Sequence, residues 1–368
     1  MQLSPLGLAE KKIPGTYRMI HHLSFPEGSS INDNIPQDNC SVQYASIQDA
    51  IELIKIKTVG RTSFCAKTDI SSAFRIINIT ESQYKLFGFM WEGKYYYDKN
   101  LQMGCSSSCQ IFEKFSSAIE WIARKKLLIT HMVHILDDFM IVDKTEDGCK
   151  KKLNRFLAIC KDMGIPISKE KTFQPSQVMS FVGYEIDTQL MEVRLPIDKL
   201  DKCNNIITVV LQKEKITLRE LQSIIGTLNF ACAVVIPGRA FLRRLIDLTI
   251  GVKKSFHRIR MTKSVQQDLN TWQNFLRNFN GKSLILSDRW LTSDQLHLFT
   301  DASGTLGYGA LFGAQWFLGK WDTKWQKQNI AFLELYPIVL AVEIWGHQIK
   351  NQCIYFHTDN IALVSVIQ

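Results

Sequence analysis

The stretch HMVHILDDFMIVD, residues 131–143, places two adjacent acids, Asp137 and Asp138, in the middle of an apolar run. Two carboxylates about 4 Å apart repel by roughly 4 kcal/mol at an effective dielectric constant near 20. Water at an exposed turn, a shared proton or a bound cation can offset that cost. The flanking apolar runs predict two strands, and a tight hairpin between them would lift both acids to the edge of a sheet. An isolated acid pair is most often a solvated turn, so the cation hypothesis needs a third acid.

The third acid is Asp69, which closes the predicted buried strand SFCAKTDI. If that strand lies beside the hairpin, Asp69 faces Asp137 and Asp138. Three converging carboxylates with no cationic side chain beside them would suit divalent metal ions. Two Mg²⁺ ions about 3.5–4 Å apart can activate an attacking oxygen and stabilise a leaving one in phosphoryl transfer. The sequence therefore predicts a metal site here, although spacing alone leaves the convergence open.

Composition predicts a class of binding partner and a cellular compartment. The chain has 368 residues, enough for two or three domains, and 44 Lys and Arg against 35 acids, a net charge of +9. This excess favours a polyanionic partner. The nine cysteines include no CxxC pair, which indicates reduced thiols, and no apolar run is long enough to span a membrane. We expect an intracellular protein without membrane contact.

Hydrophobic periodicity and turn residues predict the other elements. They are a helix from a capping box at Ser46–Asp49, an aromatic hairpin around Glu92-Gly93, helices over 109–126 and 149–164, a short strand over 181–187, and a mainly helical region from about residue 195 with a capping box at Thr217–Glu220. The segment 239–263 gathers eight Lys and Arg against one acid. Such a run is usually a solvated face, but it would suit a phosphate backbone if it lined a groove.

Five motifs occur in order: KTDISSAFRIINI, LQMGCSSSCQIFEKF, HILDDFMIV, GIPISKEKT and SFVGYEID. Together they resemble the palm motifs of reverse transcriptases, and the chain looks most like the DIRS-like retrotransposon group. YRMIHHLSFPEGSSINDNIP and LRELQSIIGTLNFACAVVIPGRAFLRRLIDL are similar to that group's fingers and thumb. The resemblance implies an α+β right-hand polymerase. Fingers and palm would span 1–190, a helical thumb and connection 191–290, and a partial, RNase H-like α/β domain 291–368.

The resemblance also implies roles for individual residues. Asp69, Asp137 and Asp138 would bind two Mg²⁺ ions, or Mn²⁺, and Lys171 would protonate the pyrophosphate leaving group. Matches to nucleotide-binding positions are Lys11, Arg18, Phe74, Gln102 and Gly104. The primer grip would contain Phe181, Gly183 and Tyr184. The basic residues expected on the nucleic-acid backbone are Arg239, Arg243, Arg244, Lys253 and Lys254. Ile135 departs from the family, which has Tyr two positions before the acid pair, so a contact near the primer end is lost.

The order Asp301, Glu334, Asp359 resembles the metal-binding carboxylates of ribonuclease H. Asp301 lies in TDAS, Glu334 in AFLELYPIVLAVEIW, and Asp359 in HTDN. The chain stops at Gln368, soon after the third acid, so we expect an incomplete RNase H domain that cleaves RNA poorly.

These inferences predict an RNA-directed DNA polymerase that joins deoxynucleotides to the primer of an RNA or DNA template-primer duplex. Two alternatives stay open. One is a non-catalytic nucleic-acid-binding remnant of a decayed or domesticated element, and the other is a polymerase with an inactive RNase H part. The sequence does not predict the oligomeric state.

Overall fold

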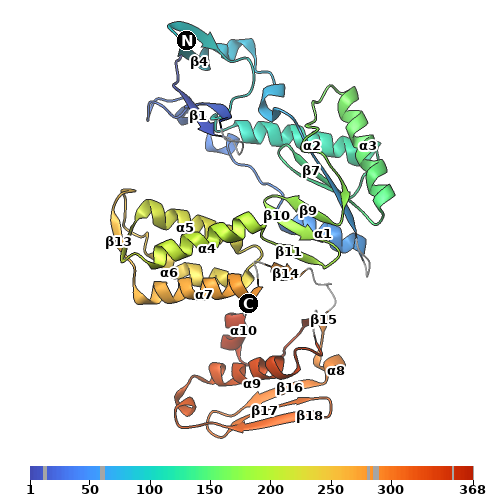
Figure 1. Cartoon of the computed structure of the whole chain (residues 1–368), viewed down its shortest axis with the longest axis vertical. Helices are drawn as coiled ribbons and strands as arrows, with labels where there is room; N and C mark the ends of the chain where they lie inside the picture. The colour runs from blue at the N-terminus through green and yellow to red at the C-terminus, as the bar shows by residue number, and fades with distance from the viewer. Residues whose placement is uncertain (11–14, 59–62, 280–281, 285–289, 350–351, 368) are drawn as a thin grey trace. The chain divides into compact units, whose positions relative to one another are not determined.

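A computed structural model describes residues 1–10, 15–58, 63–279, 282–284, 290–349 and 352–367. The chain divides into two compact units, Met1–Ser283 and Leu284–Gln368. The boundary lies close to the one predicted near residue 290, where the character of the sequence changes. Figure 1 shows the elements of both units in chain order.

A four-stranded antiparallel sheet forms the centre of the first unit. Its strand order is β6 (Met132–Ile135), β7 (Asp138–Asp143), β3 (Phe64–Asp69) and β8 (Phe173–Ser176). The apolar runs predicted as strands on both sides of the acid pair are therefore β6 and β7, and the predicted buried strand is β3. Because these strands are adjacent, the ends of β3 and β7 that carry acids meet at one edge.

Two helices cover one face of this sheet. They are α2 (Ser108–Lys126) and α3 (Glu146–Asp162), whose apolar stripes pack on alternate residues of β3 and β7. Phe112 of α2, Phe156 of α3 and Phe139 of β7 are fully buried in this shared core. Thr145 caps α3 through a hydrogen bond from the Gly148 amide. The packed face fixes the register of the strands, since a shift of one residue would turn their apolar side chains outward.

The chain before this sheet forms smaller elements. The hairpin of β1 (Leu6–Glu10) and β2 (Tyr17–His21) precedes helix α1 (Ile47–Thr58), and β4 (Gly88–Trp91) pairs with β5 (Lys94–Tyr97). Ser46 and Asp49 exchange the hydrogen bonds of the predicted cap before α1. The aromatic hairpin predicted around Glu92-Gly93 is confirmed as β4–β5.

The segment FVGYEID is a hairpin rather than the single short strand we predicted. β9 (Val178–Phe181) turns back at Val182-Gly183 into β10 (Tyr184–Asp187), and β11 (Glu192–Arg194) and β14 (Lys282–Leu284) extend the sheet. Val182 and Gly183 have φ values of 53° and 83°, a left-handed turn that glycine makes accessible.

The rest of the first unit is mainly helical, as predicted. It contains α4 (Ile197–Leu211), α5 (Leu218–Ala231), α6 (Arg243–Asp247) and α7 (Lys263–Phe279), with β12 (Lys215–Thr217) paired to β13 (Arg258–Arg260). The capping box Thr217–Glu220 begins α5. Trp272 of α7 is fully buried, and its ring lies against Gly238, where a larger residue would clash.

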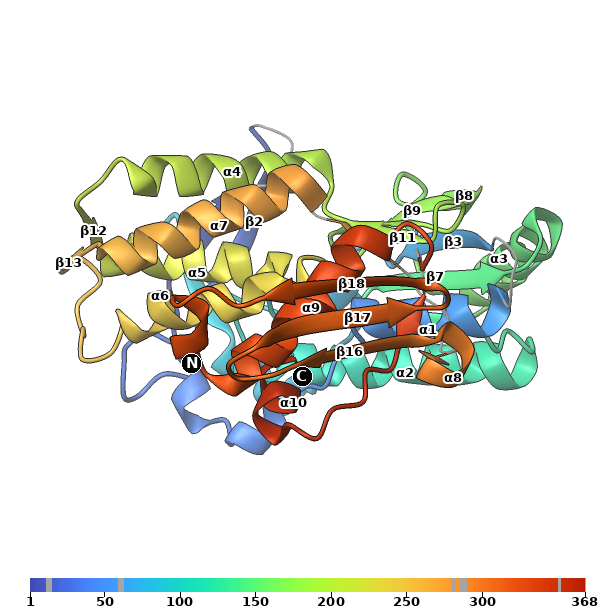
Figure 2. The same ribbon diagram turned by 90° about the horizontal axis from the view of Figure 1, so that it is seen from below.

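The second unit has a three-stranded antiparallel sheet and one long helix. The strands are β16 (Leu298–Ala302), β17 (Gly307–Phe312) and β18 (Gln315–Lys320), side by side in that order (Figure 2). Helix α9 (Ile330–Trp345) packs on one face through Ala341 and Trp345. The remaining elements are β15 (Trp290–Leu291), α8 (Ser293–Leu296), β19 (Cys353–Ile354) and α10 (Ile361–Ile367), and β19 runs parallel to β15.

Candidate active site

The structure brings Asp69 and Asp138 together. Asp69, the last residue of β3, is the direct cross-strand partner of Asp138, the first residue of β7. Cβ atoms of such partners lie about 4.5–5.5 Å apart, so their carboxylates share one patch at the sheet edge. Asp69 is 8% exposed. The spatial convergence that spacing left open is therefore present for these two acids.

Asp137 occupies the tight turn that joins β6 to β7. Ile135 pairs with Asp138, so Leu136 and Asp137 form a two-residue loop, and Leu136 has a φ of 52°. The loop is held from two sides. The Leu136 amide donates to Glu113 Oε2 of α2 at 2.9 Å, and the Asp137 carbonyl accepts from the Ile70 amide at 2.9 Å. These bonds fix Asp137 beside the end of β3.

Two lysines lie against the acids, which contradicts our expectation that no cationic side chain would be present. Lys67 Nζ of β3 lies 3.0 Å from Asp138 Oδ2, and Lys171 Nζ lies 2.9 Å from Asp69 Oδ2. The sequence motif gives no separate signal for Lys67, because it lies within an otherwise apolar strand. Strand alternation could have identified it, since residues two apart on a strand share a face. The Lys67 side chain is 16% exposed and that of Lys171 is 59% exposed.

Burial and mutual repulsion shift the pKa values of Asp137 and Asp138. Burial raises the pKa of Asp137 above its ordinary value, and the charge of Asp69 raises it further. Burial also raises the pKa of Asp138, against the opposing effect of Lys67. The hydrogen bond to Asp69 raises the pKa of Lys171. The site therefore concentrates negative charge that the protein alone only partly compensates.

The donor set suits a hard divalent cation. Carboxylate oxygens are the ligands that Mg²⁺ prefers, and Asp138 Oδ1 is buried without a hydrogen-bond partner in the described part of the chain. Within the described ranges, no three His, Cys, Asp or Glu side chains are arranged as a ready metal-binding group. At the β3–β7 edge, one oxygen of Asp138 instead accepts a hydrogen bond from Lys67, and one oxygen of Asp69 accepts a hydrogen bond from Lys171.

The residues matched to nucleotide binding have different surroundings. Arg18 of β2 is exposed, and its charge lowers the pKa of Asp137, so it lies near the acids. Phe74 packs edge-on against Phe112, with 5.4 Å between ring centroids. Gln102 is 1% exposed and donates to the Asn100 carbonyl, so its side chain lies inside the protein rather than on an open face. Gly104 has a φ of 114°, and a Cβ there would lie 2.0 Å from the His21 carbonyl oxygen. Lys11 lies outside the described residues.

The residues matched to the primer grip connect the β9–β10 hairpin to α5. The Tyr184 ring stacks on Phe230 at 4.4 Å, and the Tyr184 hydroxyl donates to the Phe230 carbonyl at 2.7 Å. A Cβ on Gly183 would lie 3.1 Å from the Phe230 ring. Phe181 is fully buried. The β9–β10 hairpin is thus attached to α5 by this aromatic stack and by the Tyr184 hydrogen bond.

The five predicted backbone-binding residues are all exposed. Two of them also have acidic partners: Arg243 pairs with Asp247 at 3.0 Å and Arg244 with Asp268 at 3.2 Å. Asp268 is 4% exposed, so Arg244 neutralises a buried carboxylate as well as adding positive charge to the surface. Arg239, Lys253 and Lys254 complete the set.

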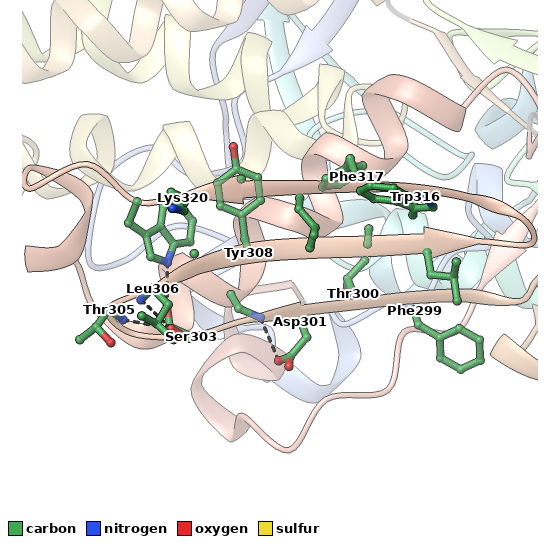
Figure 3. A pocket seen from close by; sticks show the side chains of 18 of the residues that line it. Phe299, Thr300, Asp301, Ser303, Thr305, Leu306, Tyr308, Trp316, Phe317 and Lys320 are labelled. Carbon is green, nitrogen blue, oxygen red and sulfur yellow. Dashed lines mark hydrogen bonds between the residues drawn. The ribbon is translucent and has the colours of Figure 1, made fainter.

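The three acids of the second unit lie on three different elements. Thr300 pairs with Ala310, which packs toward α9, so Asp301 is on the opposite face of the sheet, while Glu334 is on α9 itself. One metal site formed by Asp301, Glu334 and Asp359 stays a prediction. Asp359 is exposed before α10. Asp301 Oδ1 instead accepts from the Ala302 amide at 2.8 Å (Figure 3).

Asp301 lines a hollow of about 1210 Å³ over β16, β17 and β18, shown in Figure 3. Exposed apolar side chains dominate it, among them Phe299, Leu311, Trp316 and Leu318. This lining differs from the acids and lysines at the β3–β7 edge. None of the helices in the described ranges combines the length and apolar character needed to cross a bilayer.

Sequence comparison relates the chain to retroelement proteins. Residues 9–186 match the sequence model of the family described as reverse transcriptase (RNA-dependent DNA polymerase). The chain is 26% identical over 211 residues to a putative enzymatic polyprotein of Cassava vein mosaic virus, covering 57% of this chain and 28% of that protein. It is 26% identical over 320 residues to the transposon Tf2-3 polyprotein of Schizosaccharomyces pombe, covering 82% of this chain and 22% of that protein. The chain thus spans about a quarter of the length of these relatives.

Solved structures share the fold. The foamy viral protease-reverse transcriptase in complex with double-stranded DNA superposes with a TM-score of 0.59 at 19% identity, covering 99% of this chain and 71% of that one. The same viral protein in complex with an RNA/DNA hybrid has a TM-score of 0.58 at 18% identity, covering 96% and 44%. The fold is α+β and that of a right-hand polymerase, as predicted. Residues 9–186, which hold the β3–β7 acids, are thus similar in sequence to the reverse transcriptase family, and a transposon polyprotein is among the relatives of the chain.

Proposed function

We propose that this chain is an RNA-directed DNA polymerase that transfers nucleotides with two divalent metal ions, Mg²⁺ or Mn²⁺. The observation that carries the proposal is the pairing of Asp69 with Asp138 beside the Asp137 turn. The family match over residues 9–186 supports the same activity. The DIRS-like group is proposed from the motif strings alone.

Asp69, Asp137 and Asp138 would hold the metal ions. When bound, the metals supply Lewis acidity at the primer 3′-oxygen and neutralise phosphate charge. The Glu113 and Ile70 bonds hold the Asp137 turn in place for this task. Lys171, whose side chain is exposed and close to Asp69, can donate a proton to the leaving pyrophosphate.

The substrates would be deoxynucleoside triphosphates and a template-primer duplex. Exposed Arg18 is suited to bidentate contact with the nucleotide phosphates. Phe74, wedged against Phe112, would limit the room for a ribose 2′-hydroxyl. The basic surface around Arg239 and Lys253 would neutralise backbone phosphates. Structures of the foamy viral enzyme with duplexes motivate this partner class.

The second unit is proposed as the RNase H-like part on the resemblance of TDAS and HTDN. The separation of Asp301 from Glu334 favours a polymerase whose RNase H part is inactive in this chain. Hydrolysis of a labelled RNA/DNA hybrid tests this, since cleavage lost in Glu334→Gln would argue for an active second site.

Primer extension on a primed homopolymer template tests the polymerase. Asp137→Asn should lower the rate about a thousandfold, because each metal ion supplies several kcal/mol and each 1.36 kcal/mol is a factor of ten. Asp147→Asn is the matched control, since Asp147 is an exposed acid of α3 that pairs with Lys151. A folded wild-type chain that binds duplex but adds no nucleotide would instead favour the non-catalytic remnant.

A further inference from the structure

The charge balance of the acid patch depends on a residue to which the family resemblance assigns no role. Asp69, Asp137 and Asp138 carry three negative charges, and Lys67 and Lys171 carry two positive ones. Of the two lysines, Lys67 is much the less exposed, at 16% against 59%. Ion pairs shielded from water interact more strongly than exposed ones, so Lys67 has the larger effect.

Lys67 reaches Asp138 diagonally across the sheet. It lies two residues before Asp69, on the same face of β3, and Asp69 is the partner of Asp138. Its Nζ donates to Asp138 Oδ2 at 3.0 Å. The other oxygen, Oδ1, is buried and has no hydrogen-bond partner among the described residues. The Asp138 carboxylate therefore has one oxygen bound to Lys67 and one oxygen without a hydrogen bond among the described residues.

We propose that Lys67 is a built-in counter-ion that competes with divalent metal for the Asp138 carboxylate and thereby sets the metal affinity of the site. The inference rests on the proposed function in one respect, namely that these acids bind metal. A metal ion that uses Asp138 Oδ2 must displace the ammonium group, and one that uses Oδ1 must approach a positive charge. In both cases Lys67 weakens metal binding.

The surroundings allow Lys67 to move away from Asp138. Its Nζ lies 5.8 Å from the centroid of the Phe173 ring on β8, the strand on the other side of β3. This is already within the range of a cation–π contact, which is worth about 0.5–1 kcal/mol. Because lysine has a flexible four-carbon stem, Lys67 can keep this contact with Phe173 when a metal ion takes its place at Asp138.

The test measures Mn²⁺ affinity directly, by isothermal titration with Mn²⁺ as the only ligand. Lys67→Met keeps an unbranched side chain that is one atom shorter and removes its charge, so Mn²⁺ should bind about tenfold more tightly. The melting temperature of this variant should be lower than wild type in chelator, and it should rise more than wild type when Mn²⁺ is added.

The matched control is Lys152→Met. Lys152 pairs with Asp143 at the opposite end of β7, and its side chain is similarly buried, at 21% exposed. Its loss should lower the melting temperature equally with and without Mn²⁺, and leave Mn²⁺ affinity unchanged. If Lys67→Met does not fold, Lys67→Gln removes the charge but keeps a hydrogen-bond donor for Asp138.

The inference would be overturned if both Lys67 variants bound Mn²⁺ no more tightly than the wild-type chain. It would also be overturned if neither the wild-type chain nor the variants bound Mn²⁺. Primer extension is scored separately. If wild type extends no primer but Lys67→Met still gains affinity, the polymerase proposal fails and the counter-ion stands. If wild type extends primer and the affinities are equal, the counter-ion alone fails.

Discussion

At the scale of single residues, the site is a balance of opposing charges. Asp138 lies between two acids that repel it and one lysine that attracts it, and burial acts against its charged form. Among the described residues no lysine hydrogen-bonds Asp137, and burial and Asp69 raise its pKa against the smaller opposing effects of Lys171 and Arg18. Burial and repulsion of these carboxylates cost free energy of folding, and a bound cation would remove that cost. Such an arrangement is expected of a functional site.

The raised pKa of Asp137 predicts how stability depends on pH. A carboxyl whose pKa is raised on folding contributes stability that is complete below the unfolded pKa and is lost as the pH rises through the folded pKa. Asparagine cannot ionise, so Asp137→Asn removes this loss of stability at high pH. In chelator, its free energy of unfolding at pH 7 should exceed wild type by about 0.5–1 kcal/mol, the range for partly exposed charges.

Urea unfolding across pH 3 to 8 measures this difference, which should shrink as the pH falls toward about 4 and disappear below it, where both states are protonated. A variant less stable than wild type at pH 7 would contradict the prediction.

At the scale of elements, the β6–β7 hairpin depends on a helix for its shape. Leu136 has the backbone conformation that usually requires glycine, and Glu113 of α2 binds its amide. The same helix supplies Glu120, which hydrogen-bonds His134 of β6. His134 Nε2 also lies 3.3 Å from Glu113 Oε1, close but without hydrogen-bond geometry.

Glu113→Ala should therefore loosen the turn that presents Asp137. It leaves the Leu136 amide without its acceptor, which costs about 1–3 kcal/mol of stability. We expect at least a tenfold lower kcat for primer extension, since a misplacement of about 1 Å costs as much as a hundredfold in rate. Faster hydrogen exchange of the Leu136 amide would locate the effect.

Glu113→Gln keeps an acceptor and should retain most of the rate, and Lys114→Ala, at an exposed neighbouring position, is the control. Wild-type kcat in Glu113→Ala would show that the turn does not need this bond.

Most elements were predictable because their signals are local. The capping boxes at Ser46 and Thr217 are present as predicted, and so is the hairpin at Glu92-Gly93. FVGYEID was predicted wrongly as one strand because its apolar residues continue across the turn. The glycine in it was the signal for the hairpin, and Phe230, far away in the sequence, packs against that glycine.

At the scale of the whole molecule, the proposed polymerase site belongs to one of the two units. Every residue proposed to act in nucleotide transfer lies within Met1–Ser283. A chain of residues 1–283 should therefore fold and extend a primer at a rate close to that of the full chain. Circular dichroism melting and primer extension measure this. A folded 1–283 chain without extension would mean that the second unit contributes to the reaction.

The sequence alone determined most of the strands and helices, the motifs and the identity of the acids, since these depend on local patterns of burial and turn chemistry. Only the tertiary structure decided which charges meet. It paired Asp69 with Asp138, placed Lys67 and Lys171 beside them, and separated Asp301 from Glu334. The physical reason is that strand register and the face on which a side chain projects depend on packing between distant segments, and a shift of one residue reverses them.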